Sequence, residues 1–338
     1  GGNTIMRKEI RTTLLAYAFA ALLALPAAAP APAKETITFA YLLDPAYAAV
    51  VWPLTHGKVT SDTVDVNVKS LDIPALLQAT GAKTYDVVMT AAIGVPQAKS
   101  RGLELSIMAT ALRNQAHGGK GGAIYVKADS PYKTMTDLKG KTLATQSLPS
   151  TGTTLMRIGL WKTYGLNVAF DGGDLRWVEV PATAMPGALL TRRIDAAELT
   201  HSEAYNARNS KDFRVLANLD DAINKAIGEP AVVAILAGYP EKLAAKPAAY
   251  KEFARMVKAS ADYTRAHVDE VAGALSKEDK MDPAFFSEWL NEYTQVPMVV
   301  SDADVKAIQR LWELSKELNI IKEYPSAESM IWKDAIRQ

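Results

Sequence analysis

A strand pattern followed by a helix pattern recurs along this 338-residue chain, stops at a glycine-rich segment and then starts again. The segment is His117-Gly118-Gly119-Lys120-Gly121-Gly122. Strand patterns lie before it at 36–41, 64–68, 85–89 and 105–109, and after it at 123–126, 141–144, 175–180, 194–199 and 213–216. Alternating strands and helices form parallel sheets that helices cover. We therefore expect an α/β protein of two lobes, each a mostly parallel sheet flanked by helices.

The glycine-rich segment predicts a flexible crossing between the lobes, and the apolar strand pattern at 231–237 predicts the return. The expected boundaries are lobe I at 34–120 and 230–338, lobe II at 121–229, and hinge crossings near 114–126 and 226–233. Helical patterns at 250–271, 283–293 and 301–318 predict a helical C-terminal extension of lobe I.

Residues 1–33 are expected to be an N-terminal extension and a signal peptide. Arg7, Lys8 and Arg11 precede an apolar run at 12–25, and a small, Pro-rich segment ends at Ala33. The apolar run is shorter than the roughly 20 residues of a membrane-spanning helix. The sequence therefore predicts a periplasmic protein that is cleaved near Ala33.

Composition argues against several classes of function. Lys plus Arg (38) balances Asp plus Glu (37), so we expect no nucleic-acid partner. The chain has no cysteine, and its four histidines show no pair at the spacing of a helical zinc site. No Gly-x-Ser-x-Gly nucleophile motif occurs. We expect no enzymatic activity, no metal and no cofactor.

The segment 145–157 predicts a strand, a loop and a helix in succession, and its polar residues suggest a binding site. Ser150, Thr151 and Thr153 are of the types that cap helices, and Gly152 allows a ligand to approach the backbone. Free N–H groups and the helix dipole favour an anion at such a helix start. Helix capping alone would also explain the hydroxyl residues.

The order of several segments resembles the periplasmic solute-binding proteins of the ABC-transporter group for nitrate, aliphatic sulfonates, taurine and thiamine-pyrimidine precursors, which have the type II periplasmic binding protein fold. The resemblance spans about 36–331 and is carried by Ile37-Thr38-Phe39-Ala40-Tyr41, Tyr85-Asp86-Val87-Val88, 123–131, Asp137-Leu138-Lys139-Gly140-Lys141, Arg193-Ile194-Asp195-Ala196-Ala197 and 317–321. Two features depart from the family pattern: Arg193 stands where glycine is usual, and Thr200-His201-Ser202-Glu203 replaces the common motif.

The resemblance implies a monomer that binds a small molecule between its lobes and delivers it to the membrane permease of an ABC importer. Within that group we expect a small organic anion such as a sulfonate, a nitrate-like ion or a carboxylate. Two alternatives stay open: a heteroaromatic compound of the thiamine-pyrimidine type, and a sensor that reports to a membrane partner.

The expected ligand-binding residues come from both lobes. They are Asp44, Tyr47, Thr90, Ala91, Arg113, Ser150, Thr151, Gly152, Thr153, Thr183, His201 and Glu203. Arg113 could bind an anion through two hydrogen bonds, and His201 could donate or accept one. Other roles would equally explain three of these residues: a hinge salt bridge for Arg113, a hydrogen bond at the cleft rim for His201, and a turn before Pro45 for Asp44.

Overall fold

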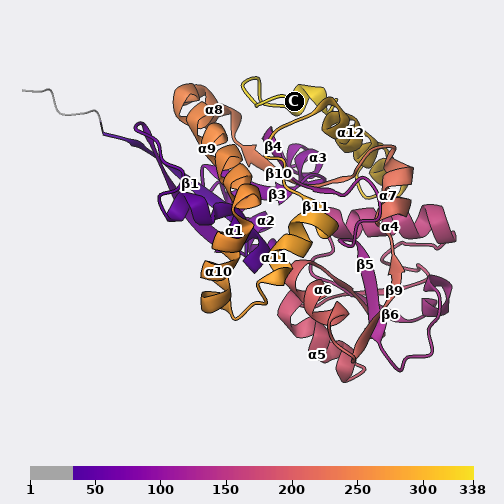
Figure 1. Ribbon diagram of the computed structural model, residues 1–338. Helices are drawn as coiled ribbons and strands as arrows, with labels where there is room; N and C mark the ends of the chain where they lie inside the picture. Colours follow the sequence, from indigo (N-terminus) through magenta and orange to yellow (C-terminus); the bar gives the residue numbers. More distant parts are fainter. Residues whose placement is uncertain (1–32) are drawn as a thin grey trace, which may run out of the picture. The chain divides into compact units, whose positions relative to one another are not determined.

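The computed structural model describes residues 33–338 (Figure 1). The expected signal peptide at 1–33 lies outside the described residues apart from Ala33. Within the described part, no helix is long and apolar enough to span a membrane.

Lobe I is the part of the chain around a sheet in the order β11-β4-β10-β3-β1-β2. Its strands are β1 (Glu35–Leu42), β2 (Val64–Leu71), β3 (Val87–Ala91), β4 (Ser106–Asn114), β10 (Val232–Gly238) and β11 (Thr294–Gln295). Strands β2 and β3 pair in parallel with β1, whereas β10 runs antiparallel to both β3 and β4. Strands β1, β2, β3 and β4 therefore run in the same direction.

Lobe II is the part around a second sheet, in the order β7-β6-β8-β5-β9. Its strands are β5 (Ala123–Lys127), β6 (Thr142–Thr145), β7 (Arg176–Glu179), β8 (Ala196–Leu199) and β9 (Phe213–Asn218). Here β6 pairs in parallel with β7 and β8, and the crossing strand β5 runs antiparallel to β8 and β9. The expected α/β fold with two mostly parallel sheets is confirmed.

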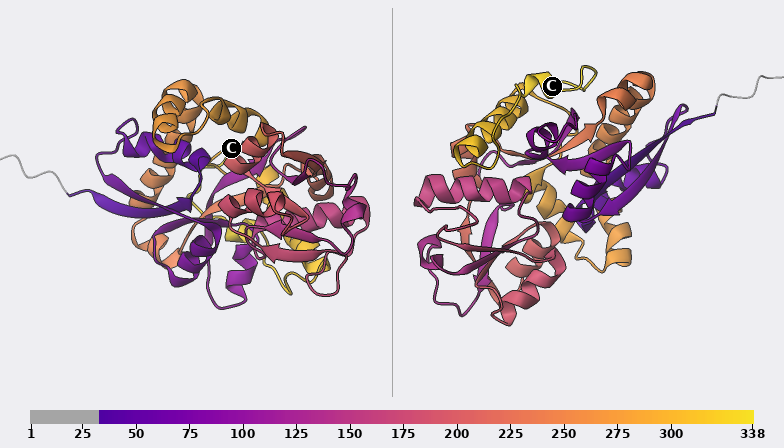
Figure 2. Two further views of the ribbon diagram at one scale, coloured as in Figure 1. Left: turned by 90° about the horizontal axis from the view of Figure 1, so that it is seen from below. Right: turned by 180° about the vertical axis from the view of Figure 1, so that it is seen from behind.

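Helices flank both sheets (Figures 1 and 2). The α-helices are α1 (Pro45–Thr55), α2 (Ile73–Ala82), α3 (Gly94–Lys99), α4 (Thr151–Tyr164), α5 (Met185–Leu190), α6 (His201–Arg208), α7 (Asp220–Ile227), α8 (Pro240–Ala245), α9 (Pro247–Ala266), α10 (Val268–Asp279), α11 (Ala284–Glu288) and α12 (Asp302–Glu317). Three short 3₁₀ helices are η1 (Met135–Leu138), η2 (Ala182–Ala184) and η4 (Glu328–Met330), and η3 (Trp289–Tyr293) is a π-helical turn.

Two of the expected C-terminal helices differ from the prediction. The single helix expected at 250–271 is wrong, because the backbone leaves the helical region at His267 (φ −131°) and the chain continues as α9 and then α10. The helix expected at 283–293 begins as α11 and ends in the π-helical turn, which directs Trp289 toward lobe II.

The crossing from lobe I to lobe II is fixed by one buried acid. Asp220, at the start of α7, accepts hydrogen bonds from the backbone N–H groups of Gly121 (2.9 Å) and Gly122 (2.7 Å). A Cβ atom at Gly122 would lie 2.4 Å from Asp220 Oδ1, so the close approach requires glycine. The exact lobe boundaries stay a prediction, since contacts join residues 34–338 into a single unit.

Candidate functional site

A cleft lies between the two sheets and is lined from both lobes. It has two adjoining parts, and the residues that line both are Leu112, Gly152, Glu198, Thr200, His201 and Val233. The part nearer α1 and α2 has a cavity volume of about 100 Å³.

The N-terminus of α4 reaches the cleft, but most of its hydroxyls already have partners. Ser150 is the helix cap, and its Oγ accepts from the Thr153 N–H (3.1 Å). Thr151 Oγ1 accepts from the Ile93 N–H of lobe I (3.1 Å). Ser150, Thr151 and Gly152 line the cleft. Thr153 does not, because its hydroxyl is buried against Thr145 and the Ser147 carbonyl.

His201 begins α6 with an unusual positive φ of 50° and lines both parts of the cleft. Its Nδ1 accepts a hydrogen bond from the indole N–H of Trp289 (3.0 Å), which lies in lobe I. Because that nitrogen accepts, the proton of the neutral ring is assigned to Nε2. Burial lowers the pKa of His201, while the nearby Asp44 carboxylate acts in the opposite direction. The ring is therefore a neutral hydrogen-bond donor at physiological pH.

Tyr47 of α1 lines the cleft and is only 1% exposed. Its ring packs edge-on against His201 (5.1 Å between ring centroids) and Trp289 (5.5 Å). Its hydroxyl has no hydrogen-bond partner among the described residues. A buried hydroxyl without a partner is costly, so a ligand that supplied one would be favoured.

Two predicted acidic residues lie behind the cleft surface. Asp44 caps α1 through the Ala46 N–H (2.9 Å) and accepts from the Ser202 hydroxyl of lobe II (2.7 Å). It therefore joins the lobes without lining the cleft. Glu203 also does not line it, and burial raises the pKa of Glu203, to which the Asp44 carboxylate adds.

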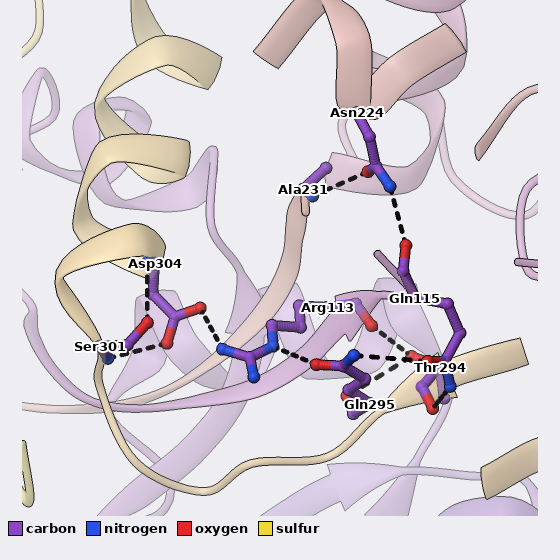
Figure 3. A network of polar contacts seen from close by, with 8 residues as sticks. All are labelled: Arg113, Gln115, Asn224, Ala231, Thr294, Gln295, Ser301 and Asp304. Atoms are coloured by element: carbon purple, nitrogen blue, oxygen red, sulfur yellow. Dashed lines mark hydrogen bonds and ion pairs between the residues drawn. The ribbon is translucent and has the colours of Figure 1, made fainter. Parts of the chain in front are cut away.

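Of the remaining predicted residues, Thr90 and Ala91 line the cleft at the end of β3. Thr183 is exposed on η2 and is not part of the lining. The structure places Arg113 in a hinge network instead, where its guanidinium contacts Asp304 (2.9 Å) and Gln295 (2.5 Å; Figure 3). These contacts match the salt-bridge role that the sequence left open for Arg113.

The same network spans both crossings. Asn224 of α7 accepts from the Ala231 N–H (3.0 Å) and donates to the Gln115 carbonyl (2.8 Å), and the Thr294 hydroxyl donates to the Arg113 carbonyl (2.8 Å; Figure 3). The crossing segments are therefore linked by side chains rather than free of contacts.

Sequence reasoning missed Glu198, which lines both parts of the cleft from β8 and is 8% exposed. Its Oε2 accepts from the Thr145 hydroxyl (3.1 Å), and its Oε1 has no partner among the described residues. Burial raises the pKa of Glu198 to about 7, and Asp220 adds to the shift. One feature of the sequence could have indicated Glu198: it is an acid within the otherwise apolar strand Ala196-Ala197-Glu198-Leu199.

Asp220 was also missed. It lines the cleft while accepting from Gly121 and Gly122, and burial raises the pKa of Asp220 to about 6 in spite of those two hydrogen bonds. Thr200 and Gln146, joined by a hydrogen bond (2.7 Å), complete the polar lining together with Asn114, Thr145 and Thr294.

The charges of this cleft are all of one sign. Among the described residues that line it, none is lysine or arginine, whereas two are acids. No group of three or more possible metal ligands is found in the described part of the chain.

Two lobes that enclose such a cleft define a ligand-binding protein of the periplasmic binding protein fold. A profile of the family described as "ABC transporter, phosphonate, periplasmic substrate-binding protein" matches residues 59–234, which is more than half of the chain. The chain belongs to this family.

Solved structures agree at the level of the fold. The aliphatic sulphonate binding protein SsuA from Escherichia coli is 16% identical (TM-score 0.68; 90% of this chain and 94% of that chain covered). The alkanesulfonate-binding protein SsuA from Xanthomonas axonopodis pv. citri, bound to MOPS, is 17% identical (TM-score 0.70; 90% and 100%). A Candida albicans protein with the generic periplasmic binding protein fold is 12% identical (TM-score 0.69; 90% and 98%). No curated protein sequence matches the chain.

Proposed function

We propose that this protein is the periplasmic substrate-binding component of an ABC importer. It captures a small molecule in the cleft, closes over it and presents the closed form to a membrane permease, without chemical turnover and as a monomer. Membership of the family supports this role.

The observation that carries the proposal is a set of hydrogen bonds that join the lobes around the cleft. Ser202 donates to Asp44, the Ile93 N–H donates to Thr151, and Trp289 donates to His201. Thr151 and His201 also line the cleft, so the residues that close the protein lie beside the ligand position. A ligand that contacts both lobes would stabilise this closed arrangement over an open one.

The two ligand classes that the sequence left open differ in charge. A sulfonate or carboxylate would find donors at the start of α4, where Thr151 and Gly152 line the cleft, and at His201, but it would find no cationic side chain and would lie near Glu198. The heteroaromatic alternative fits better, because aromatic and aliphatic side chains form most of the lining and Glu198 can accept from a ring nitrogen or amine. We therefore favour a compound with N–H donors.

A thermal-unfolding screen tests the function. Protein that has been unfolded and refolded to remove bound ligand is heated with sulfonates, phosphonates, carboxylates, aminopyrimidines and amines. A ligand at 100 times its Kd stabilises the fold by about 2.7 kcal/mol, which raises Tm by several degrees. A shift with one chemical class supports capture of that class. No shift with any class would contradict the proposed function.

A further inference from the structure

We propose that the ligand of the cleft carries a protonated nitrogen, such as an ammonium or amidinium group, and that Oε1 of Glu198 binds it. This inference rests on the proposed function, since it concerns the ligand of the same cleft. It assigns to this chain a cationic ligand, whereas the names of its structural relatives refer to anions.

The first support is the position of the Glu198 carboxylate. Oε2 accepts a hydrogen bond from the Thr145 hydroxyl. Oε1 lies next to Gly152, where a Cβ atom would be 3.3 Å from it. The absence of a side chain at Gly152 leaves room beside Oε1. Glu198 is 8% exposed and its Oε1 has no side-chain or backbone partner among the described residues, so a cationic donor in the cleft would hydrogen-bond this oxygen and favour the ionised carboxylate.

The second support is the charge around this carboxylate. Asp220 also lines the cleft, and Arg208, whose charge lowers the pKa of Asp220, lies over Tyr293 (5.9 Å to the ring centroid) and is not part of the lining. His201 is neutral, because Trp289 donates to it and burial disfavours its charge. No described lysine or arginine lines the cleft, so only the partial positive charge at the start of α4 lies beside Glu198, and a cationic ligand would add the full charge.

The third support is the surface next to the carboxylate. Tyr47, Met89, Leu112 and Val233 provide apolar surface, and the Tyr47 hydroxyl has no hydrogen-bond partner among the described residues. A compound with a flat or aliphatic body and one cationic end would match this arrangement of one acid, one hydroxyl and apolar walls.

The test compares three probes of nearly the same shape by titration calorimetry: benzamidinium, neutral benzamide and benzoate. An amidinium can donate two hydrogen bonds to a carboxylate, and hydrogen bonds to charged groups correspond to about 10- to 100-fold in affinity. We expect benzamidinium to bind most tightly, benzamide more weakly and benzoate weakest. Equal or tighter binding of benzoate, or no binding of benzamidinium, would overturn the proposal.

The variant Glu198→Gln tests whether Glu198 is the residue that binds the cationic group. It keeps an acceptor for Thr145 but removes the negative charge, so benzamidinium should lose about 10- to 100-fold in affinity while benzamide changes little. Glu313→Gln, on the outer surface of α12 beside Arg310, is the matched control and should bind all three probes as the parent does. An unchanged affinity of Glu198→Gln for benzamidinium would exclude Glu198 as the recognition group.

The two proposals fail differently. If a sulfonate or phosphonate raises Tm and benzamidinium does not bind, the cationic ligand is excluded and the capture function stands. If no compound of either sign binds, both proposals fall.

Discussion

Glu198 links stability and ligand choice at the scale of a single residue. Burial raises its pKa from the usual 4.5 to about 7, so between these pH values the folded protein keeps a proton that the unfolded chain has released. The free energy of unfolding should therefore fall as pH rises from 4.5 to 7, by roughly 3 kcal/mol from this group.

Urea unfolding of ligand-free protein at several pH values tests this prediction. Glu198→Gln has no proton to lose, so relative to the parent it should gain up to roughly 3 kcal/mol of stability between pH 4.5 and 7. Asp220 and His201 also line the cleft and titrate in both proteins, so the difference reports the titration of Glu198 together with its coupling to Asp220. A difference that does not depend on pH would show that Glu198 is ionised normally.

Trp289 determines which nitrogen of His201 carries the proton. Removing its N–H in Trp289→Phe frees Nδ1 to take up a proton, so we expect the pKa of His201 to rise and ligand affinity to fall about tenfold. NMR titration of the His201 ring protons measures the first effect. Trp312→Phe is the control, since Trp312 is equally buried but donates to the Ala92 carbonyl. The same His201 pKa in both variants would contradict the assignment.

At the scale of elements, the glycine at position 152 in the first turn of α4 leaves space for a ligand beside Glu198. Gly152→Ala places a methyl group 3.3 Å from Glu198 Oε1, whereas Gly273→Ala in α10 meets nothing within 4 Å. Alanine stabilises a helix by about 0.5–1 kcal/mol over glycine, so Gly273→Ala should raise stability and leave binding unchanged. Gly152→Ala should gain less stability, and its affinity for the ligand should fall on the order of tenfold. Unchanged binding by Gly152→Ala would place the ligand elsewhere.

The contact between α1 and α6 should contribute to closure. Ser202→Ala removes a hydrogen bond to the Asp44 carboxylate, and such bonds contribute about 1.5–3 kcal/mol. We expect weaker ligand binding and a faster dissociation rate, which surface plasmon resonance measures. Ser329→Ala removes an exposed hydroxyl that donates only to Ser326, and it should have no effect. Equal dissociation rates for the two variants would mean that this contact does not support closure.

Residue patterns predicted the elements better than they predicted the site. The strand pattern at 64–68 and the helical pattern at 301–318 are local features, and both are present, as β2 and α12. Helix capping likewise identified Ser150 correctly. Such features depend on neighbours along the chain, which the sequence displays directly.

The cleft depends on pairings that no local pattern contains. Arg113 was expected to bind an anionic ligand, but its guanidinium forms a salt bridge with Asp304, which is distant in sequence. Glu198 looked like an ordinary strand residue until the neighbouring α4 was placed beside it. Trp289 was not among the expected ligand-binding residues, and its hydrogen bond to His201 depends on a π-helical turn that periodicity does not predict.

At the scale of the whole molecule, the proposed function requires the two lobes to close over a ligand. The chain has no cysteine, so two introduced cysteines can carry fluorescent labels without competing sites. Gln78 on α2 and Arg193 after α5 are exposed and belong to different lobes. Any compound that raises Tm in the thermal-unfolding screen serves as the ligand in this experiment.

Single-molecule energy transfer between labels at these two positions, with and without such a compound, is the most direct measurement. We expect an open population in the ligand-free protein, alone or beside a closed one, and a shift to a single closed population that is half-complete at a free ligand concentration equal to the Kd from calorimetry. A ligand that binds with no change in energy transfer, also when the labels are moved to other exposed positions of the two lobes, would contradict closure as the basis of function.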